Sequence, residues 1–448
     1  MFLLDNPLRP YAWGSQHAIA ELLGREPSGE PEAELWVGAH PDSPSRIIGQ
    51  DGSRTGLDEA IADDPRGLLG EDTATRFGDR LPFLLKVLAA ASALSLQVHP
   101  DAGQAAAGFD AEEAAGVPRS AAHRTYRDRN HKPELLYTLS AFEALCGFRP
   151  AAESVPVFAA LAAAVDPGSE AHGFLDSVAA RLVVGGKDTL RAAFAQTLHA
   201  PRDVVDAVVD AVEGMVSTGS ESTPPPAGGR PGDTDDAVAR DLATVRELAA
   251  QYPGDPGVLV ALLLNRVSLR AGEALYLPAG NVHAYLSGLG IEVMASSDNV
   301  LRGGLTPKHV DPDALLDTVV FEAVPPPTLA PEYTLFDQEL YRPPFDEFQL
   351  QRIVLEGTPG DPAAGPGADG HSHVPVLQNG PVVVLAVSGP ILLDTPRSTL
   401  LVPRGGSAFV GASEAPLMVR AANDQHDADG PVLAFAVTVG EGPQRAGA

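Results

Sequence analysis

Three short segments, far apart in the chain, carry residue types that could together hold a metal ion. Gln97 and His99 stand two positions apart in an alternating run, so in a strand both side chains would point the same way. Glu134 begins an apolar run, where a carboxylate needs a cation or hydrogen-bond donors. His283 ends a turn-rich phrase. Two imidazoles, a carboxylate and an amide oxygen are a ligand set for a divalent metal, if the fold brings them together.

Each segment alone has an ordinary structural interpretation. A Gln-x-His pair is most simply the polar face of a half-exposed strand, and Lys132 with Glu134 is most simply a surface ion pair. His283 differs because its surroundings are more specific: the phrase from 272 to 283 contains two glycines and a proline, which is typical of a strand that ends in a tight turn. The metal hypothesis therefore depends on the convergence of all three segments.

The elements that must position these residues are predicted to be strands. Apolar or alternating runs predict strands at 33–38, 81–88, 93–99, 135–139, 274–277 and 290–294. Further strands are expected at 381–387, 391–394 and 432–438. The phrase 401–406 faintly repeats 275–280, which hints at a duplicated β unit.

A helical block divides the two strand-rich regions. Apolar spacings of three and four predict helices at 155–165, 204–216 and 242–248. The Pro/Gly/Ser-rich stretch at about 217–236 predicts a flexible, disordered insert, and 357–375 is a second loop of this kind. The period of 258–264 does not decide between a strand and a buried helical turn.

These patterns predict a mainly β fold: two β-barrels or jelly rolls plus an α-helical insert. The predicted domains are 1–150, the first part of a catalytic barrel; 151–257, the helical domain; 258–320, the remainder of that barrel; and 321–448, a C-terminal β domain.

Composition limits the partners of the chain. The formal net charge of −28 over 448 residues opposes binding to nucleic acid or anionic membranes. The one cysteine, Cys146, excludes an intrachain disulfide and fits a reducing compartment. We find neither a signal peptide nor an apolar stretch approaching about 20 residues. We therefore expect a cytoplasmic protein that acts on a small molecule, with no nucleic-acid or membrane partner.

Seven collinear segments resemble the type I mannose-6-phosphate isomerases of the cupin superfamily. They are Tyr11–Ser15, Glu34–Pro41, Leu81–Lys86, Ser95–Asp101, Asn130–Glu134, Tyr276–Leu286 and Ser297–Lys308. They span roughly the first 310 residues and are specific as a set, whereas the C-terminal third matches only in its general β character. By this resemblance both β units are cupin-like barrels, and we expect a monomer.

The resemblance implies one zinc ion per chain, held by Gln97, His99, Glu134 and His283. The implied reaction interconverts mannose 6-phosphate and fructose 6-phosphate through an enediol, so the partner is a sugar phosphate. Arg302 matches the arginine that stabilises charge growing on the C1 and C2 oxygens. Lys86, Ser95 and Lys308 match positions that contact the phosphate.

The residue that carries the proton between C1 and C2 stays open. Four residues are candidates: His131, Lys132, Glu292 and Asp298. Geometry decides which of them reaches the hydrogen, and the sequence does not rank them.

Two alternative functions remain. One is a metal-dependent cupin oxygenase, although Gln97 is a poor iron ligand and such sites usually contain more histidines. The other is a non-catalytic cupin that binds sugars, although such a protein would be expected to lose metal ligands or Arg302.

Overall fold

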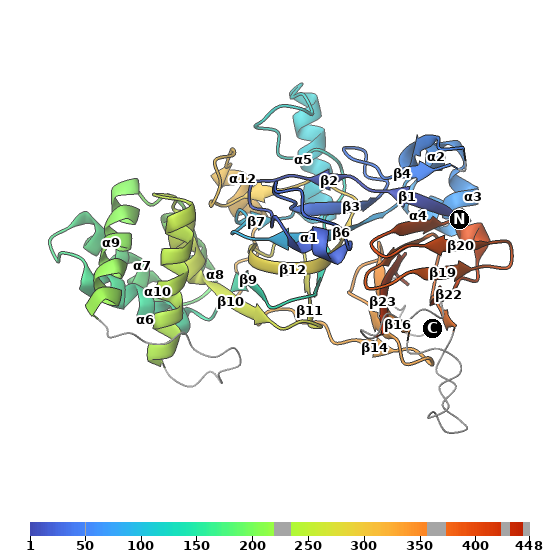
Figure 1. The fold of residues 1–448 in the computed structure, drawn as a ribbon. Helices are drawn as coiled ribbons and strands as arrows, with labels where there is room; N and C mark the ends of the chain where they lie inside the picture. The colour runs from blue at the N-terminus through green and yellow to red at the C-terminus, as the bar shows by residue number, and fades with distance from the viewer. Residues whose placement is uncertain (50, 219–233, 356–372, 423–430, 442–448) are drawn as a thin grey trace, which may run out of the picture.

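The computed structural model describes residues 1–49, 51–218, 234–355, 373–422 and 431–441. Both predicted flexible stretches, 217–236 and 357–375, fall largely outside these ranges. A block of helices forms one end of the molecule, a ten-stranded sheet lies in the middle, and the C-terminal strands form the other end (Figure 1). Among the described residues, no helix combines the length and apolar character that a membrane crossing requires.

The central sheet is assembled from strands on both sides of the helical block. Its order is β10-β9-β12-β6-β3-β2, with β8 and β7 also paired to β12, β11 paired to β8 and β13 paired to β7. The strands are β2 (Leu8–Arg9), β3 (Glu34–Gly38), β6 (Phe83–Ala90), β7 (Gln97–Val98), β8 (Glu134–Thr138), β9 (Phe142–Phe148), β10 (Leu264–Leu269), β11 (Ala274–Leu277), β12 (His283–Ala295) and β13 (Leu301–Arg302). Most agree with the predicted runs, but β7 is only two residues long.

Strand β12 organises this sheet because it is long and bent. Its first residues pair with β7 and β9, and its last residues pair with β6 and β8. The register against β9 shifts between Tyr285 and Ser287, and Gly288 follows with φ +129°. A Cβ at Gly288 would lie 2.5 Å from Phe142, so the bend requires glycine.

The two faces of the sheet have different roles. In β6, Leu85 and Val87 belong to a core shared with Phe409 and Phe435 of the C-terminal strands. Alternation turns Lys86 to the opposite face, where it stands beside Glu292 of β12 in register. The polar face of the sheet is therefore the one on which a site can be built.

The second large sheet joins the two ends of the chain. Its order is β14-β15-β16-β23-β18-β21-β1-β4-β5, made of β14 (Glu332–Tyr333), β15 (Glu339–Tyr341), β16 (Gln349–Leu355), β23 (Val432–Thr438), β18 (Val382–Ala386), β21 (Ser407–Val410), β1 (Phe2–Asp5), β4 (Arg46–Ile48) and β5 (Arg54–Gly56). A four-stranded sheet packs on it: β17 (Val374–Pro375), β22 (Met418–Ala421), β19 (Ile391–Asp394) and β20 (Thr399–Val402). No sequence pattern predicts the pairing of β1 with β21.

The helical block confirms the predicted helices. It contains α6 (Ala151–Ala164), α7 (Glu170–Val184), α8 (Lys187–Leu198), α9 (Arg202–Thr218) and α10 (Thr234–Gln251). The undecided stretch 258–264 is mostly helical: α11 (Gly257–Val260) and the 3-10 turn η1 (Ala261–Leu263). Both are fully buried, so apolar residues occupy every side of the helix and no apolar periodicity is visible in the sequence.

Shorter helices fill the remaining connections. They are α1 (Ala18–Leu22), α2 (Leu57–Asp63), α3 (Pro65–Leu69), α4 (Glu71–Phe77), α5 (Ala102–Ala114), α12 (Pro312–Thr318) and the 3-10 turn η2 (Ala412–Glu414). The fold is thus mixed α and β, with several antiparallel sheets and a helical segment, rather than mainly β.

Candidate metal centre

Three of the four predicted metal ligands meet in one buried cluster. Nitrogen and oxygen atoms of His99, Glu134 and His283 all lie within 4.8 Å of one another. Nε2 of His99 is 3.2 Å from Glu134 Oε1, and Nε2 of His283 is 3.5 Å from Glu134 Oε2. The three residues are at most 4% exposed. The convergence on which the metal hypothesis depended is therefore present.

Strand ends bring these side chains together. Glu134 is the first residue of β8, His283 is the first residue of β12, and His99 directly follows β7. The pairing of β12 with both β7 and β8 draws the three ends to one place. The backbone pairing of these strands therefore places the three side chains next to one another.

Backbone carbonyls determine how both imidazoles are oriented. Nδ1 of His99 lies 2.8 Å from the carbonyl oxygen of Asn299, and Nδ1 of His283 lies 3.0 Å from that of Asn281. A carbonyl only accepts, so each Nδ1 donates and each neutral ring carries its lone pair on Nε2. Both lone pairs are thus available beside Glu134.

The electrostatics favour the protonation states that a metal requires. Burial lowers the pKa of His99 and lowers that of His283 to about 4, so both rings are neutral at pH 7. Burial acts to raise the pKa of Glu134, but Lys132 and the two imidazoles hold it well below its usual value. The Lys132 ammonium is 2.7 Å from Glu134 Oε1. The carboxylate is therefore ionised.

The residues fit zinc. Nε2 of His99 is a buried atom without a hydrogen-bond partner among the described residues, because the nearby carboxylate oxygen can only accept. A buried lone pair facing an ionised carboxylate is costly unless a cation lies between them. Two imidazole nitrogens and one carboxylate oxygen are also ordinary ligands for catalytic zinc, which leaves further positions open.

Gln97, the fourth predicted ligand, stands beside the cluster. On β7 it lies in register with His283 on one side and with Arg302 of β13 on the other. Directly opposite residues share a face of the sheet, so Gln97 faces the cluster. Its Nε2 donates a hydrogen bond to Ser95 Oγ at 3.3 Å, and this bond does not involve the amide oxygen Oε1, which is the atom that would bind a metal. Its role as a ligand stays a prediction.

Lys86 lies in a buried charge network. Its ammonium is 3.1 Å from Glu292 Oε2 and 3.6 Å from Glu34 Oε1, and Glu34 accepts a bond of 2.7 Å from Trp36 Nε1. Burial opposes its charge, but the two glutamates raise the pKa of Lys86. Burial raises the pKa of Glu292. A phosphate contact by Lys86 stays a prediction, since two carboxylates already surround its ammonium.

Arg302, Arg127 and Lys308 form a positive group, in which Arg302 lies opposite Gln97 in register. Burial and the nearby Arg127 lower the pKa of Arg302, while burial and both arginines lower the pKa of Lys308. Within the described parts of the chain, no carboxylate lies within 4.0 Å of any of these three cations. Such unpaired like charges are suited to an anion. Arg127 belongs to this group although no individual role was predicted for it.

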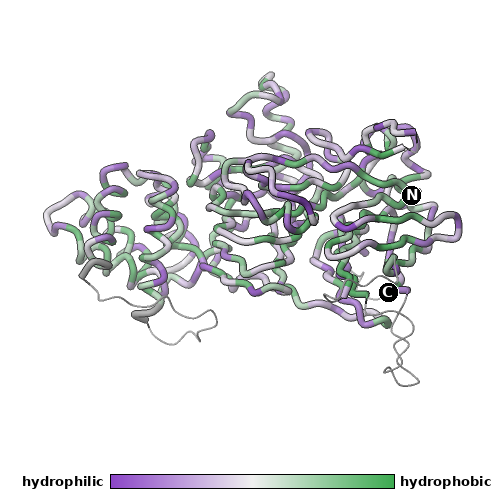
Figure 2. Tube along the Cα trace, viewed as in Figure 1, coloured by the Kyte–Doolittle hydropathy of each residue, from purple (hydrophilic) through white to green (hydrophobic). Residues whose placement is uncertain are grey.

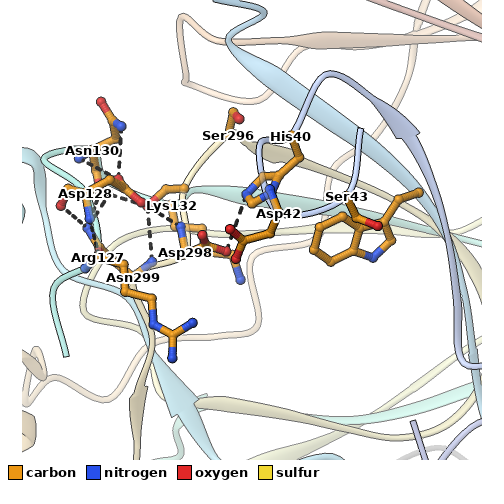
Figure 3. A network of polar contacts seen from close by, with 12 residues as sticks. His40, Asp42, Ser43, Arg127, Asp128, Asn130, Lys132, Ser296, Asp298 and Asn299 are labelled. Atoms are coloured by element: carbon orange, nitrogen blue, oxygen red, sulfur yellow. Dashed lines mark hydrogen bonds and ion pairs between the residues drawn. The ribbon is translucent and has the colours of Figure 1, made fainter. Parts of the chain in front are cut away.

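Asp298, a candidate proton carrier, belongs to a second polar network (Figure 3). Its carboxylate is 3.4 Å from His40 Nε2. It is also 2.9 Å from the Arg119 guanidinium, which in turn contacts Asp42 at 2.9 Å. Burial and Asp42 raise the pKa of Asp298 to about 6. Burial, with help from Lys86, lowers the pKa of His40 to about 4.

The remaining candidate, His131, contacts a different part of the chain. Its Nε2 lies 2.6 Å from Oε1 of Glu347, just before β16. His131 therefore bridges the central sheet and the second large sheet. Its assignment as a proton carrier is untested.

No sequence pattern predicts a role for several residues that the structure places at the site. Glu34, His40, Asp128 and Asn299 all contact predicted site residues or the segments that carry them. A signal existed for some: Glu34 and His40 lie within a matching segment, as does Asn299. Their contacts join segments that are remote in sequence, so no local pattern specified their roles.

Comparison with known proteins identifies relatives that cover most of this chain. Residues 1–151 match the family model described as phosphomannose isomerase type I, catalytic domain. The chain is similar to mannose-6-phosphate isomerase of Salmonella typhimurium, 37% identical over 418 residues (92% of this chain, 95% of the relative). It is also similar to those of Escherichia coli, 36% over 419 residues (93% and 96%), and Homo sapiens, 30% over 438 residues (93% and 94%).

Solved structures extend the similarity to the whole chain. A crystal structure of mannose 6-phosphate isomerase from Salmonella typhimurium, bound to fructose 6-phosphate and zinc, matches with a TM-score of 0.80 at 34% identity. The match covers 98% of this chain and 99% of that one.

Proposed function

The chain belongs to the type I phosphomannose isomerases, and we propose that its mannose-6-phosphate isomerase activity is carried out at the His99–Glu134–His283 cluster. One observation carries this assignment: three remote segments place two oriented imidazoles and an ionised carboxylate around one buried point. The reaction interconverts mannose 6-phosphate and fructose 6-phosphate. The whole-chain similarity to a zinc- and fructose 6-phosphate-bound relative favours this over an oxygenase or a non-catalytic sugar-binding cupin.

In this proposal His99, Glu134 and His283 hold zinc, with Gln97 as a fourth ligand and one ion per chain. When bound, zinc supplies a Lewis acid that polarises substrate oxygen. Lys132 keeps Glu134 ionised through their 2.7 Å contact, and the backbone carbonyls on each Nδ1 leave each Nε2 lone pair available to a metal. These residues organise the centre before substrate arrives.

The positive group beside Gln97 binds the anionic parts of the substrate. We assign Lys308 to the phosphate, with Ser95 and Lys86 as further contacts, and Arg302 to the charge that grows on the C1 and C2 oxygens. The register of Arg302 opposite Gln97 supports this, because it places the guanidinium on the face shared with the cluster. Arg127 adds positive charge at the same place.

The proton between C1 and C2 has four candidate carriers: His131, Lys132, Glu292 and Asp298. The carboxyls of Glu292 and Asp298 have raised pKa values, and a group with a pKa near neutrality both accepts and returns a proton readily. Glu292→Gln and Asp298→Asn should be compared for exchange of the C2 hydrogen of mannose 6-phosphate with solvent deuterium. The carrier's variant should lose this exchange.

At the level of the fold, we propose that the central sheet and the two C-terminal sheets each form a cupin-like barrel. The domain boundaries predicted from sequence remain part of this proposal, except that strands β1, β4 and β5, which lie within 1–150, belong to the second large sheet. The monomeric state and cytoplasmic location also stay predictions. Size-exclusion chromatography with light scattering would test the former.

The decisive experiment combines metal analysis with an assay. Purified protein should contain about one zinc per chain and convert mannose 6-phosphate to fructose 6-phosphate in a coupled assay. Chelation should abolish the activity, and zinc, but not magnesium, should restore it. Full activity after complete removal of metal would refute the proposed centre.

A further inference from the structure

Asn299 lies where the loop after β12 meets the segment 127–130, and we infer that it is a positioning residue that ties two metal-ligand segments together (Figure 3). It is 0% exposed. It does not itself point a ligand atom at the cluster. Its effect on the metal is exerted through His99 and through the chain that leads to Glu134.

The amide oxygen and the amide nitrogen of Asn299 both form hydrogen bonds with the backbone of the segment 127–130. Its Oδ1 accepts from the backbone N–H of Arg127 at 2.7 Å and of Asp128 at 3.3 Å. Its Nδ2 donates to the carbonyls of Asp128 at 2.7 Å and Asn130 at 2.8 Å. Only an amide of this length offers two donors and an acceptor in this arrangement. Aspartate would lack the donors, and glutamine would be one methylene too long.

The backbone of Asn299 acts on the other ligand segment. Its carbonyl accepts the 2.8 Å bond from Nδ1 of His99, a residue 200 positions away. This bond selects the tautomer whose Nε2 can bind metal. His283 differs, because its Nδ1 is held by Asn281, only two positions away. His99 therefore depends on tertiary structure for its orientation, whereas His283 is oriented locally.

Neighbouring groups reinforce the same junction. Ser297 Oγ donates to Asp128 Oδ1 at 2.9 Å and accepts from the N–H of Asn299 at 3.2 Å. The N–H of Asp298 donates to Asp128 Oδ2 at 2.8 Å. Because Glu134 lies four residues beyond Asn130, any shift of this loop moves the start of β8 relative to His99.

This inference rests on the proposed metal centre, and the experiment separates the two. Zinc affinity is measured by chelator competition in the full-length protein, together with the visible spectrum of the cobalt-substituted form and the thermal midpoint of the metal-free form. Failure of the wild type to bind zinc would refute the centre. With wild-type binding established, Asn299→Ala should bind zinc about 10–100-fold more weakly and should show an altered cobalt spectrum.

The matched control is Asn379→Ala, in the bend just before β18 of the second large sheet. Asn379 also donates to a backbone carbonyl, that of Val439 at 3.1 Å, but lies in the other β region. It should lower the thermal midpoint of the metal-free protein without changing zinc affinity or the spectrum. If Asn299→Ala weakens zinc binding no more than this control does, the inference is wrong.

A milder variant keeps the test decisive if Asn299→Ala does not fold. Ser297→Ala removes one hydroxyl from the same junction and leaves the asparagine in place. A several-fold loss of zinc affinity with a shifted cobalt spectrum supports the junction as the device that positions His99. Unchanged affinity and an unchanged spectrum in Ser297→Ala would then overturn it.

Discussion

The two β regions of this isomerase are similar in secondary structure but differ in what they bury. The central sheet buries charged and titratable side chains, including Glu34, Lys86, Lys132, Glu134 and Glu292. Among the described residues of the C-terminal sheets and their turns, the buried polar side chains carry no charge: Gln338, Gln349, Gln351, Ser407 and Thr438. Hydrophobic stretches follow the strands at that end of the molecule (Figure 2).

The difference shows how one fold divides stability from chemistry. Burying a charge is costly unless partners compensate, and the central sheet compensates through pairs such as Lys86 with Glu292. The C-terminal sheets have apolar cores, and they share one of these with the back of the central sheet. The polar face can therefore be optimised for a reaction while its other face is held by packing.

The largest effect should come from removing the shared carboxylate of the centre. Glu134→Ala should lose bound zinc and lower kcat/KM by about 10³-fold, or about 4 kcal/mol, because the Lewis acid is lost. Metal analysis and the coupled assay measure both. The matched control is Glu339→Ala in the C-terminal sheets, which removes a carboxylate paired with Arg352 at 3.2 Å. Full zinc content in Glu134→Ala would remove this residue from the ligand set.

A substitution in the C-terminal core should lower stability without affecting the metal centre. Leu393 of β19 is 0% exposed in an apolar cluster, so Leu393→Ala should lower the free energy of unfolding by about 3 kcal/mol through lost burial and a cavity. Zinc content and kcat of the folded protein should stay unchanged. Urea unfolding and the coupled assay test this. A fall in kcat/KM comparable to that of Glu134→Ala would contradict the separation of the two regions.

Arg302 tests the positive group without disturbing the metal. Arg302→Ala should lower kcat by about 10²-fold, because a preorganised cation at the growing charge is lost. Its zinc content should equal that of the wild type. Arg302→Lys keeps the charge without the planar guanidinium, so its kcat should lie between that of the wild type and that of Arg302→Ala. Wild-type kcat in Arg302→Ala would exclude the catalytic role.

The smallest effect concerns pH and the buried carboxyl of Asp298. Its pKa is raised from 3.8 to about 6 in the folded protein, so between these values the folded state binds more protons than the unfolded state. The contribution of Asp298 to stability therefore falls as pH rises from about 4 to about 6. Asp298→Asn removes this contribution, so its free energy of unfolding should rise relative to that of the wild type as pH rises across this window. Parallel pH profiles would contradict the raised pKa.

Local patterns predicted much of the secondary structure and the metal-ligand candidates. The continuous apolar run of β6 and the spacing in α6, α9 and α10 were readable because each signal lies within one element. The sequence also predicts His99, Glu134 and His283 as ligands, because residue type and local setting are properties of each short segment. The length of β12, the shortness of β7 and the pairing of β1 with β21 were not readable, since strand pairing depends on remote partners.

By itself, the sequence determined which side chains were available for chemistry and which faces of strands and helices had to be buried, because side-chain type and period are local properties. Only the tertiary structure decided how they are used. Strand β12 is bent, and His283 and Glu292 therefore lie on the same face of the sheet. The tertiary structure also placed the Asn299 carbonyl on His99 and left Arg127, Arg302 and Lys308 together. These depend on distances between atoms far apart in the chain, which no local pattern contains.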